Sequence, residues 1–331
     1  MRVALTEGLG SRSTPATPAP DRQQQHLDRL KFSNLQLACP INADEISNRW
    51  LNPYVPEPNQ KVKQYPANIT SFIYRILKSY AAAAARGHDT LPFVHSMQMK
   101  EDVLGGPLTT CLNLVRMCVK PIPGSEVASQ HVLQREMEAI VEKRASYDEV
   151  SLLGAFQAYL IYSLVLYFRL GLASNSFLRQ IMMNLQDLAA FSAKHGLVCV
   201  AEQKHTRPTW EEWIVAESKR RTLYVMYLFD SILSSEEGLP TFLGTELQGL
   251  PAVGSKPLWQ AQTRTDWEAA YNFHLAEWVD SSLAIEELWP TPPGMDEAAI
   301  SKRRQRADQW LENIDEFGTM LYAVMCCTHG G

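Results

Sequence analysis

The stretch from Thr209 to Asp230 constrains the fold most, because it carries the signals of one long helix. Thr209 can accept a hydrogen bond from a free N–H of the first turn, and Glu212 follows three positions later to complete a capping box. Pro208 restricts the chain just ahead of this start. The apolar residues then keep the helical period of 3.6, at positions 210, 213, 214, 224, 225, 227 and 228. We therefore expect the rest of the chain to pack around this helix.

Charged residues interrupt the apolar stripe of this helix. Glu217 is followed at i+3 and i+4 by Arg220 and Arg221, which is the favoured order for a helical ion pair. On a solvated face such a pair contributes only about 0.2–0.5 kcal/mol. Because Glu217 continues the line of Trp213 and Tyr224, we expect at least one of the charges to be partly buried. Spacing alone leaves open the alternative of a solvated face with coincidental spacing.

Other segments also have the apolar stripes of helices, and strand-like alternation is not sustained anywhere. Three predicted helices begin at Thr70, Ser125 and Asn175, with the first ending near Gly87 and the third at Gly196. Residues 251–257 and 290–294 are rich in proline and glycine and are predicted to be loops. These patterns predict an all-α fold, a large multi-helix bundle.

Residues 151–168 carry no charge, and this run lies at the lower end of the length of a membrane span, which is about 17–25 residues. Against a membrane span, Gln157, Ser163 and three tyrosines interrupt the run, and lipid would leave their polar groups poorly satisfied. A helix that is apolar on all sides can also be the central helix of a bundle. We expect such a core helix and no membrane partner.

The composition argues against a domain that binds nucleic acid by itself. The net charge is -5 and the pI is about 5.9, whereas such domains usually have a pI above about 9. The hydrophobic share of 46% is ample for a sizeable core. The six cysteines include no C-x2-C pair, so we interpret them as reduced intracellular thiols.

The chain divides into a tail and one domain. The N-terminal segment is rich in Ser, Thr, Pro and Gln, and residues 11–20 cannot bury enough apolar surface to offset chain entropy. We therefore predict a disordered tail or linker over residues 1–40 and an all-helical domain over residues 41–331.

Motifs of helical and common hydrolytic enzymes are missing from the sequence. It contains no D-D-x-x-D, no H-E-x-x-H, no G-x-x-x-x-G-K-[ST] and no G-x-S-x-G. The adjacent carboxylates Glu211 and Glu212 point about 100° apart on a helix, so capping explains them better than catalysis. His95, after Pro92 and Phe93, is interpreted as a packing histidine rather than a ligand. We predict that the chain is not an enzyme; a helical enzyme of unrecognised type stays as a lesser hypothesis.

A basic cluster lies on another predicted helix, near the C-terminus. It consists of Lys302, Arg303, Arg304 and Arg306. Such a run can be a nuclear import signal or a nucleic-acid contact, and it can equally be a solvated helix face.

The long helix carries an ordered set of residues that resembles a known signature. The set comprises Trp210, Trp213, Glu217, Arg220, Arg221, Tyr224 and Asp230, followed downstream by Trp259 and Trp267. It resembles the regulatory (effector) domain of fungal zinc-cluster (Zn2Cys6) transcription factors. Further segments follow the order of that family: 49–51, 72–80, 91–95, 107–111, 152–168, 239–240, 245–247 and 250–251. The resemblance covers about residues 45–320, and its strength lies in the ordered set rather than in any single motif.

The resemblance implies a nuclear regulator of metabolic genes, including secondary-metabolite clusters, that acts through its helical effector domain. The signature residues would form an internal clamp rather than perform chemistry. Partners would be other transcription regulators or a second copy of the chain.

Family members carry a zinc cluster of six cysteines in C-x2-C-x6-C repeats ahead of such a domain, and this sequence has no such repeat. We therefore expect no cofactor in this chain, with zinc only in a missing N-terminal cluster, and DNA contact only indirectly or through that module. The alternative hypothesis is a DNA-binding-deficient partner that modulates a full-length zinc-cluster regulator.

Overall fold

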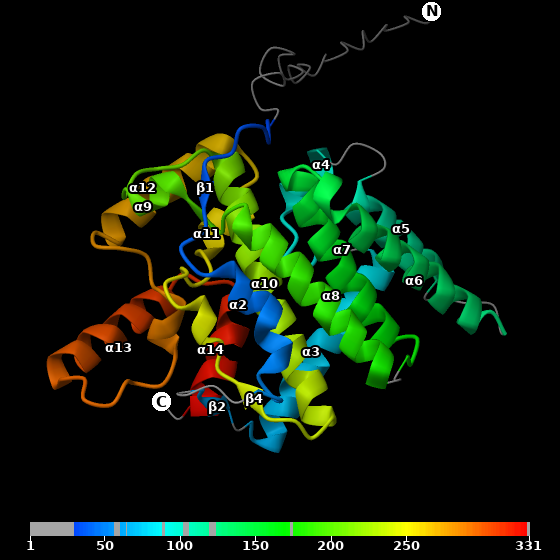
Figure 1. Ribbon diagram of the computed structural model, residues 1–331. Coiled ribbons are helices and arrows are strands. Elements are labelled where there is room, and N and C mark those ends of the chain that lie inside the picture. Colours follow the sequence, from blue (N-terminus) through cyan, green and yellow to red (C-terminus); the bar gives the residue numbers. More distant parts are fainter. Residues whose placement is uncertain are drawn as a thin grey trace, which may run out of the picture. The chain divides into compact units, whose positions relative to one another are not determined.

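Helices account for nearly all regular structure in this protein (Figure 1). A computed structural model describes residues 30–55, 60–63, 65–87, 90–101, 106–118, 124–172 and 175–329. Its α-helices are α2 (Ala43–Asn48), α3 (Ala67–Arg86), α4 (Ser96–Glu101), α5 (Pro107–Cys118), α6 (Glu126–Lys143), α7 (Glu149–Phe168), α8 (Asn175–Lys194), α9 (Val200–Gln203), α10 (Trp210–Glu236), α11 (Lys256–Gln260), α12 (Arg264–Glu277), α13 (Glu297–Leu311) and α14 (Glu316–His329). The all-α, multi-helix prediction is confirmed.

Four two-residue strands accompany the helices. Their bounds are β1 (Leu37–Ala38), β2 (Val62–Lys63), β3 (Val198–Cys199) and β4 (Thr241–Phe242). They form two antiparallel pairs, β1 with β3 and β2 with β4. Each pair ties a segment from the N-terminal part of the fold to a segment next to α10.

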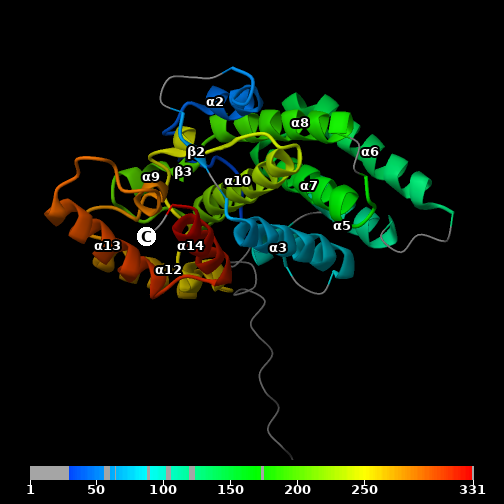
Figure 2. The same ribbon diagram turned by 90° about the horizontal axis from the view of Figure 1, so that it is seen from below.

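Helix α10 is the centre of the fold. It begins as the sequence predicts: the Thr209 hydroxyl accepts from the N–H of Glu212 at 3.3 Å, and the Glu212 carboxylate accepts from the N–H of Thr209 at 2.9 Å. Helices α3, α7, α8 and α12 all contact it, and Figure 2 shows α7 and α10 side by side. Nearly every residue of α10 from Trp210 to Leu233 is buried, polar and charged ones included. The sequence predicts burial of one apolar side of this helix, whereas in the structure the helix is buried on all sides.

Helix α7 is the apolar core helix that the uncharged run predicts. Its residues from Leu152 to Leu166 are all buried, and α3, α5, α6, α8 and α10 pack around it. Among the described residues it is the one helix long and apolar enough to cross a membrane, and 83% of that apolar window is buried inside the fold. Its polar groups have partners within the protein: the Gln157 side chain donates to the carbonyl of Phe93 at 2.7 Å.

The predicted boundary of the N-terminal tail is wrong. Leu37 and Ala38, inside the predicted tail of residues 1–40, form β1 and pair with Cys199 and Val198. The described chain from Phe32 onward belongs to one compact unit. The boundary depends on the pairing of β1 with β3, which is far along the chain. The composition of residues 1–40 does not predict this pairing. Residues 1–29 lie outside the described residues, and the disordered tail stays a prediction there.

One predicted helix start differs from the structure. Helix α3 begins at Ala67, after Pro66, rather than at Thr70, because an earlier turn brings Ile69 into the core. The start predicted at Ser125 is confirmed, since Ser125 is the N-cap residue of α6. The predicted end of α3 is confirmed: Gly87 stops the helix in the left-handed conformation, with φ of 69°.

Candidate functional site

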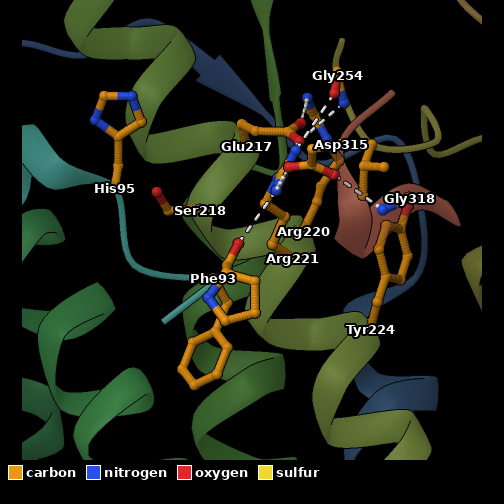
Figure 3. Close-up of polar contacts among 12 residues, drawn as sticks. Phe93, His95, Glu217, Ser218, Arg220, Arg221, Tyr224, Gly254, Asp315 and Gly318 are labelled. Carbon is orange, nitrogen blue, oxygen red and sulfur yellow. Dashed lines mark hydrogen bonds and ion pairs between the residues drawn. The ribbon is translucent and has the colours of Figure 1, made fainter. Parts of the chain in front are cut away.

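Three buried charged residues of α10 form a centre with two residues from later in the chain, and we call it the Glu217 clamp (Glu217, Arg220, Arg221, Gly254 and Asp315; Figure 3). One oxygen of the Glu217 carboxylate accepts from Nη2 of Arg220 at 2.7 Å. The other accepts from Nε of Arg221 at 2.7 Å and from the backbone N–H of Gly254 at 2.9 Å. The solvated-face alternative is therefore wrong, since these charged side chains are at most 2% exposed.

Arg221 links four segments of the chain. Its Nη1 donates to Oδ2 of Asp315 at 2.6 Å and to the carbonyl of Pro92 at 3.2 Å, and its Nη2 donates to the carbonyl of Gly254 at 3.3 Å. The guanidinium lies 4.0 Å from the ring centre of Trp259, within the range of a cation–π contact. Asp315 in turn accepts from the N–H of Gly318, so it also fixes the start of α14.

Opposite charges keep Glu217 ionised although it is buried. Burial would raise the pKa of its carboxyl group, but the charges of Arg220 and Arg221, with the hydrogen bonds from Arg221 and Gly254, lower it below its ordinary value of 4.5. For Arg220, burial would lower the pKa, and Glu217 and Glu202 together raise it above its ordinary value. The clamp is thus a set of fixed charges in the interior.

Aromatic residues of the signature cover the clamp. Trp213 lies beside Trp259 and Trp267, with ring centres 6.4 and 6.1 Å apart, and Trp210 stacks on Trp267. His95 is fully buried and packs edge-on against Trp259 at 4.8 Å. This agrees with the interpretation of His95 as a packing residue.

Gly254 approaches α10 too closely for a side chain. A Cβ atom built at this position would lie 2.8 Å from Cζ2 of Trp213 and 3.6 Å from the carboxyl carbon of Glu217. The close approach lets the backbone N–H and carbonyl of Gly254 bond Glu217 and Arg221 directly.

The remaining signature residues on α10 lie toward its C-terminal end. The Tyr224 hydroxyl donates to the carbonyl of Pro251 at 2.7 Å. Asp230 is not part of the clamp: its carboxylate binds Nε of Arg49 at 2.9 Å, and Nη1 of Arg49 binds Glu246 at 2.8 Å. Arg49 also lies 4.4 Å above the ring of Tyr227. A second, partly buried charge centre therefore holds the other end of α10.

The basic cluster on α13 divides into two kinds of residue. Arg303 donates to the carbonyls of Glu286 and Glu287 at 2.6 and 2.7 Å, and Arg306 binds the carboxylate of Glu287 at 2.7 Å. Lys302 and Arg304 are exposed. Arg303 and Arg306 of the possible import signal therefore hold the fold together. Lys302 and Arg304 lie on the surface, as expected for a solvated helix face.

Sequence reasoning missed several members of the buried network. Asp315 and Gly254 were not singled out, and Lys219, fully buried, binds Glu149 at 2.9 Å. One signal was available for Asp315: two guanidinium groups beside a single carboxylate require another anion once they are buried.

The geometry of the clamp suits a structural role. Its carboxylate has no exposed area, and both oxygens accept hydrogen bonds from protein groups. In the part of the chain that the structure describes, no group of three or more His, Cys, Asp or Glu side chains could hold a metal ion. Comparison of the chain with protein-family models, curated proteins and solved structures gives no significant match.

Replacement of Arg221 tests the clamp. We expect Arg221→Ala to lower the free energy of unfolding by more than about 2 kcal/mol, because removal of one partner from a buried ion pair costs roughly 3–5 kcal/mol. Arg304→Ala, an exposed arginine on α13, is the matched control and should change stability by less than about 0.5 kcal/mol. Urea denaturation measures both. A loss below about half a kcal/mol for Arg221→Ala would contradict the buried clamp.

A pair of glycine substitutions tests the close approach at Gly254. Gly254→Ala should destabilise the protein by about 1–3 kcal/mol, because the new methyl group overlaps Trp213. Gly154→Ala is the control: its Cβ would meet Leu108 at an ordinary 3.6 Å, and alanine stabilises a helix interior by about 0.5–1 kcal/mol over glycine. Thermal melts that show the same shift for both variants would remove the special role of Gly254.

The lowered pKa of Glu217 predicts how stability depends on pH. A carboxyl group whose pKa is lower in the fold stabilises the protein fully above its unfolded pKa, and this stabilisation is lost as pH falls through the folded pKa. Below pH 4.5, the free energy of unfolding of the wild type should therefore fall more steeply than that of Glu217→Gln. Urea denaturation at a series of pH values gives both slopes. Parallel slopes would show that Glu217 is not an ionised partner of the arginines.

Proposed function

We propose that this chain is the helical effector domain of a transcription regulator that acts in the nucleus on metabolic genes. One observation carries the proposal: segments that the family resemblance identifies separately in the sequence meet at the two charge centres of α10. Residues 91–95 reach the clamp through the carbonyl of Pro92, and Trp259 reaches it through Arg221. Residues 49–51 and 245–247 reach the opposite end of α10 through Arg49 and Glu246.

The arrangement also fits the kind of role that the resemblance implies. The polar signature residues bond to other parts of the protein, which supports a role in holding a scaffold. A rigid helical scaffold offers exposed helix faces for partner proteins, either other regulators or a second copy. We assign DNA contact to a partner or to a separate zinc-cluster module, since the net charge of this chain is -5.

A tethering assay tests the proposed function. The full chain, fused to a DNA-binding domain of known site and tagged with a fluorescent protein, is expressed in a fungal host with a reporter gene downstream of that site. We expect nuclear fluorescence and a reproducible rise or fall of reporter transcript. An inert fusion partner of equal size is the control. A fusion that occupies the site and leaves transcription at the control level would contradict an effector role.

A further inference from the structure

A cavity lies beside the basic cluster of α13, and its volume is about 540 Å³. Lys302, Arg303 and Arg306 line one side of it, and the other walls come from Lys61 and from parts of residues 243–248 and 280–292. Pockets for small molecules usually have volumes of about 300–1,000 Å³. The cavity is therefore large enough for a small organic molecule.

Arg303 brings a free hydrogen-bond donor to this cavity. Its Nε donates to the carbonyl of Glu287 at 2.7 Å, and its Nη2 donates to the carbonyls of Glu286 and Trp289. Its Nη1 makes no hydrogen bond within the described part of the chain, and it is not one of the buried side-chain atoms that lack a partner. Nη1 therefore has surface that solvent can reach. One edge of the guanidinium is fixed by the backbone, and the remaining nitrogen can donate to an external acceptor.

The positive charge of Arg303 is not balanced by a carboxylate. Within the described residues it bonds only to backbone carbonyls, and Glu287 is already bound by Arg306 at 2.7 Å. Burial lowers the pKa of the Arg303 guanidinium below its ordinary value, and the opposing charges of Glu287 and Glu286 do not offset this effect. An anion bound in the cavity would supply the charge that these groups do not.

The charges of the whole lining favour an anion with a single charge. Among the described residues, the cationic side chains of the lining outnumber its carboxylates by one: Lys61, Lys302, Arg303 and Arg306 against Asp280, Glu286 and Glu287. Lys302 and Asp280 form an exposed pair at 3.3 Å, and exposed pairs of this kind are weak. A monoanion balances this surplus, whereas a doubly charged phosphate would exceed it.

The apolar part of the lining favours an organic ligand. Trp289 and Met295 are half-buried and line the cavity together with Leu243, Pro290 and Pro292. An apolar ligand body gains free energy by covering such surface, and an inorganic anion does not. A carboxylic acid with an aromatic body combines both requirements.

We propose that this cavity binds a small organic monocarboxylate whose carboxylate accepts a hydrogen bond from Nη1 of Arg303, with Lys61 as a second cation of the site. The apolar body of the ligand would lie against Trp289 and Met295. This binding site goes beyond the proposed function and does not depend on it.

The probe pair 2-naphthoate and 2-naphthamide tests the charge of the ligand. The two molecules have nearly the same shape, and only 2-naphthoate is an anion at pH 7. With the purified full chain, isothermal titration calorimetry should show saturable binding of 2-naphthoate. The amide should bind at least about tenfold more weakly, because hydrogen bonds to an ionised acceptor are the stronger ones. Inorganic phosphate at the same concentration should not displace 2-naphthoate.

Two neighbouring alanines of α13 supply a matched pair of variants. Ala299 lines the cavity, so Ala299→Phe should fill it and abolish binding of 2-naphthoate. The substitution keeps the backbone N–H of residue 299, which bonds to Asp296 at the start of the helix. Ala298 is exposed and does not line the cavity, and Ala298→Phe should bind 2-naphthoate as the wild type does.

Charge variants test the two cations. Arg303→Gln should weaken binding of 2-naphthoate at least about tenfold, and its thermal melt shows whether the loss of the carbonyl bonds unfolds the protein. Lys61 is exposed, so Lys61→Gln should leave the fold intact and weaken binding at least about threefold. Arg304 is exposed on the same helix but does not line the cavity, and Arg304→Gln is the control with wild-type affinity.

The site is wrong if the wild type shows no saturable binding of 2-naphthoate, if it binds 2-naphthamide equally well, or if phosphate displaces 2-naphthoate. Unchanged affinity in Ala299→Phe or in Lys61→Gln would also contradict it. The first three results come from the wild type and hold even where a variant does not fold. None of them bears on the reporter assay, so failure of the site and failure of the proposed function are distinguishable.

Discussion

The fold depends most on the need to balance charge around one buried carboxylate. Glu217 has no exposed area, so its ionised form must be satisfied by protein groups alone. Arg220 and Arg221 supply two positive charges, and Asp315 supplies the second negative charge that makes the centre neutral. This requirement fixes the start of α14 against α10, although the two segments are 94 residues apart in the chain. The hydrogen bonds to Pro92 and Gly254 then add two further segments to the same point.

Such a centre constrains the arrangement of the fold more than it adds to stability. A buried ion pair contributes little net free energy compared with an apolar replacement, but a charge left without its partner is costly. Any packing that moves Asp315 or Gly254 away from α10 would leave Arg221 or Glu217 with too few partners. The second centre, where Arg49 binds Asp230 and Glu246, imposes the same condition at the other end of the helix. Two such conditions along one helix select a single placement of the segments around it.

The sequence predicts the parts of this structure that depend on local signals. The capping box at Thr209, the helix end at Gly87 and the apolar helix α7 follow from short spacings, and all are found. The pair of Glu217 with Arg220 and Arg221 was also predictable, because its members are one helical turn apart. Asp315, Gly254 and strand β1 were missed, since each acts through a partner that is distant in sequence and leaves no periodic pattern. For the same reason the predicted tail extends too far along the chain.

The way in which the buried charges are used limits where function can reside. Lys219, Arg220 and Arg221 are buried and directed to partners within the protein, so the strongest charges of α10 cannot recognise an external molecule through their paired atoms. Recognition must then use either exposed helix faces or a group that the internal contacts leave unused. The Nε of Arg220 has no hydrogen-bond partner, but it is enclosed by protein atoms and is not exposed to an external molecule. The clamp therefore bears on recognition indirectly, because it fixes the packing that decides which helix faces are exposed.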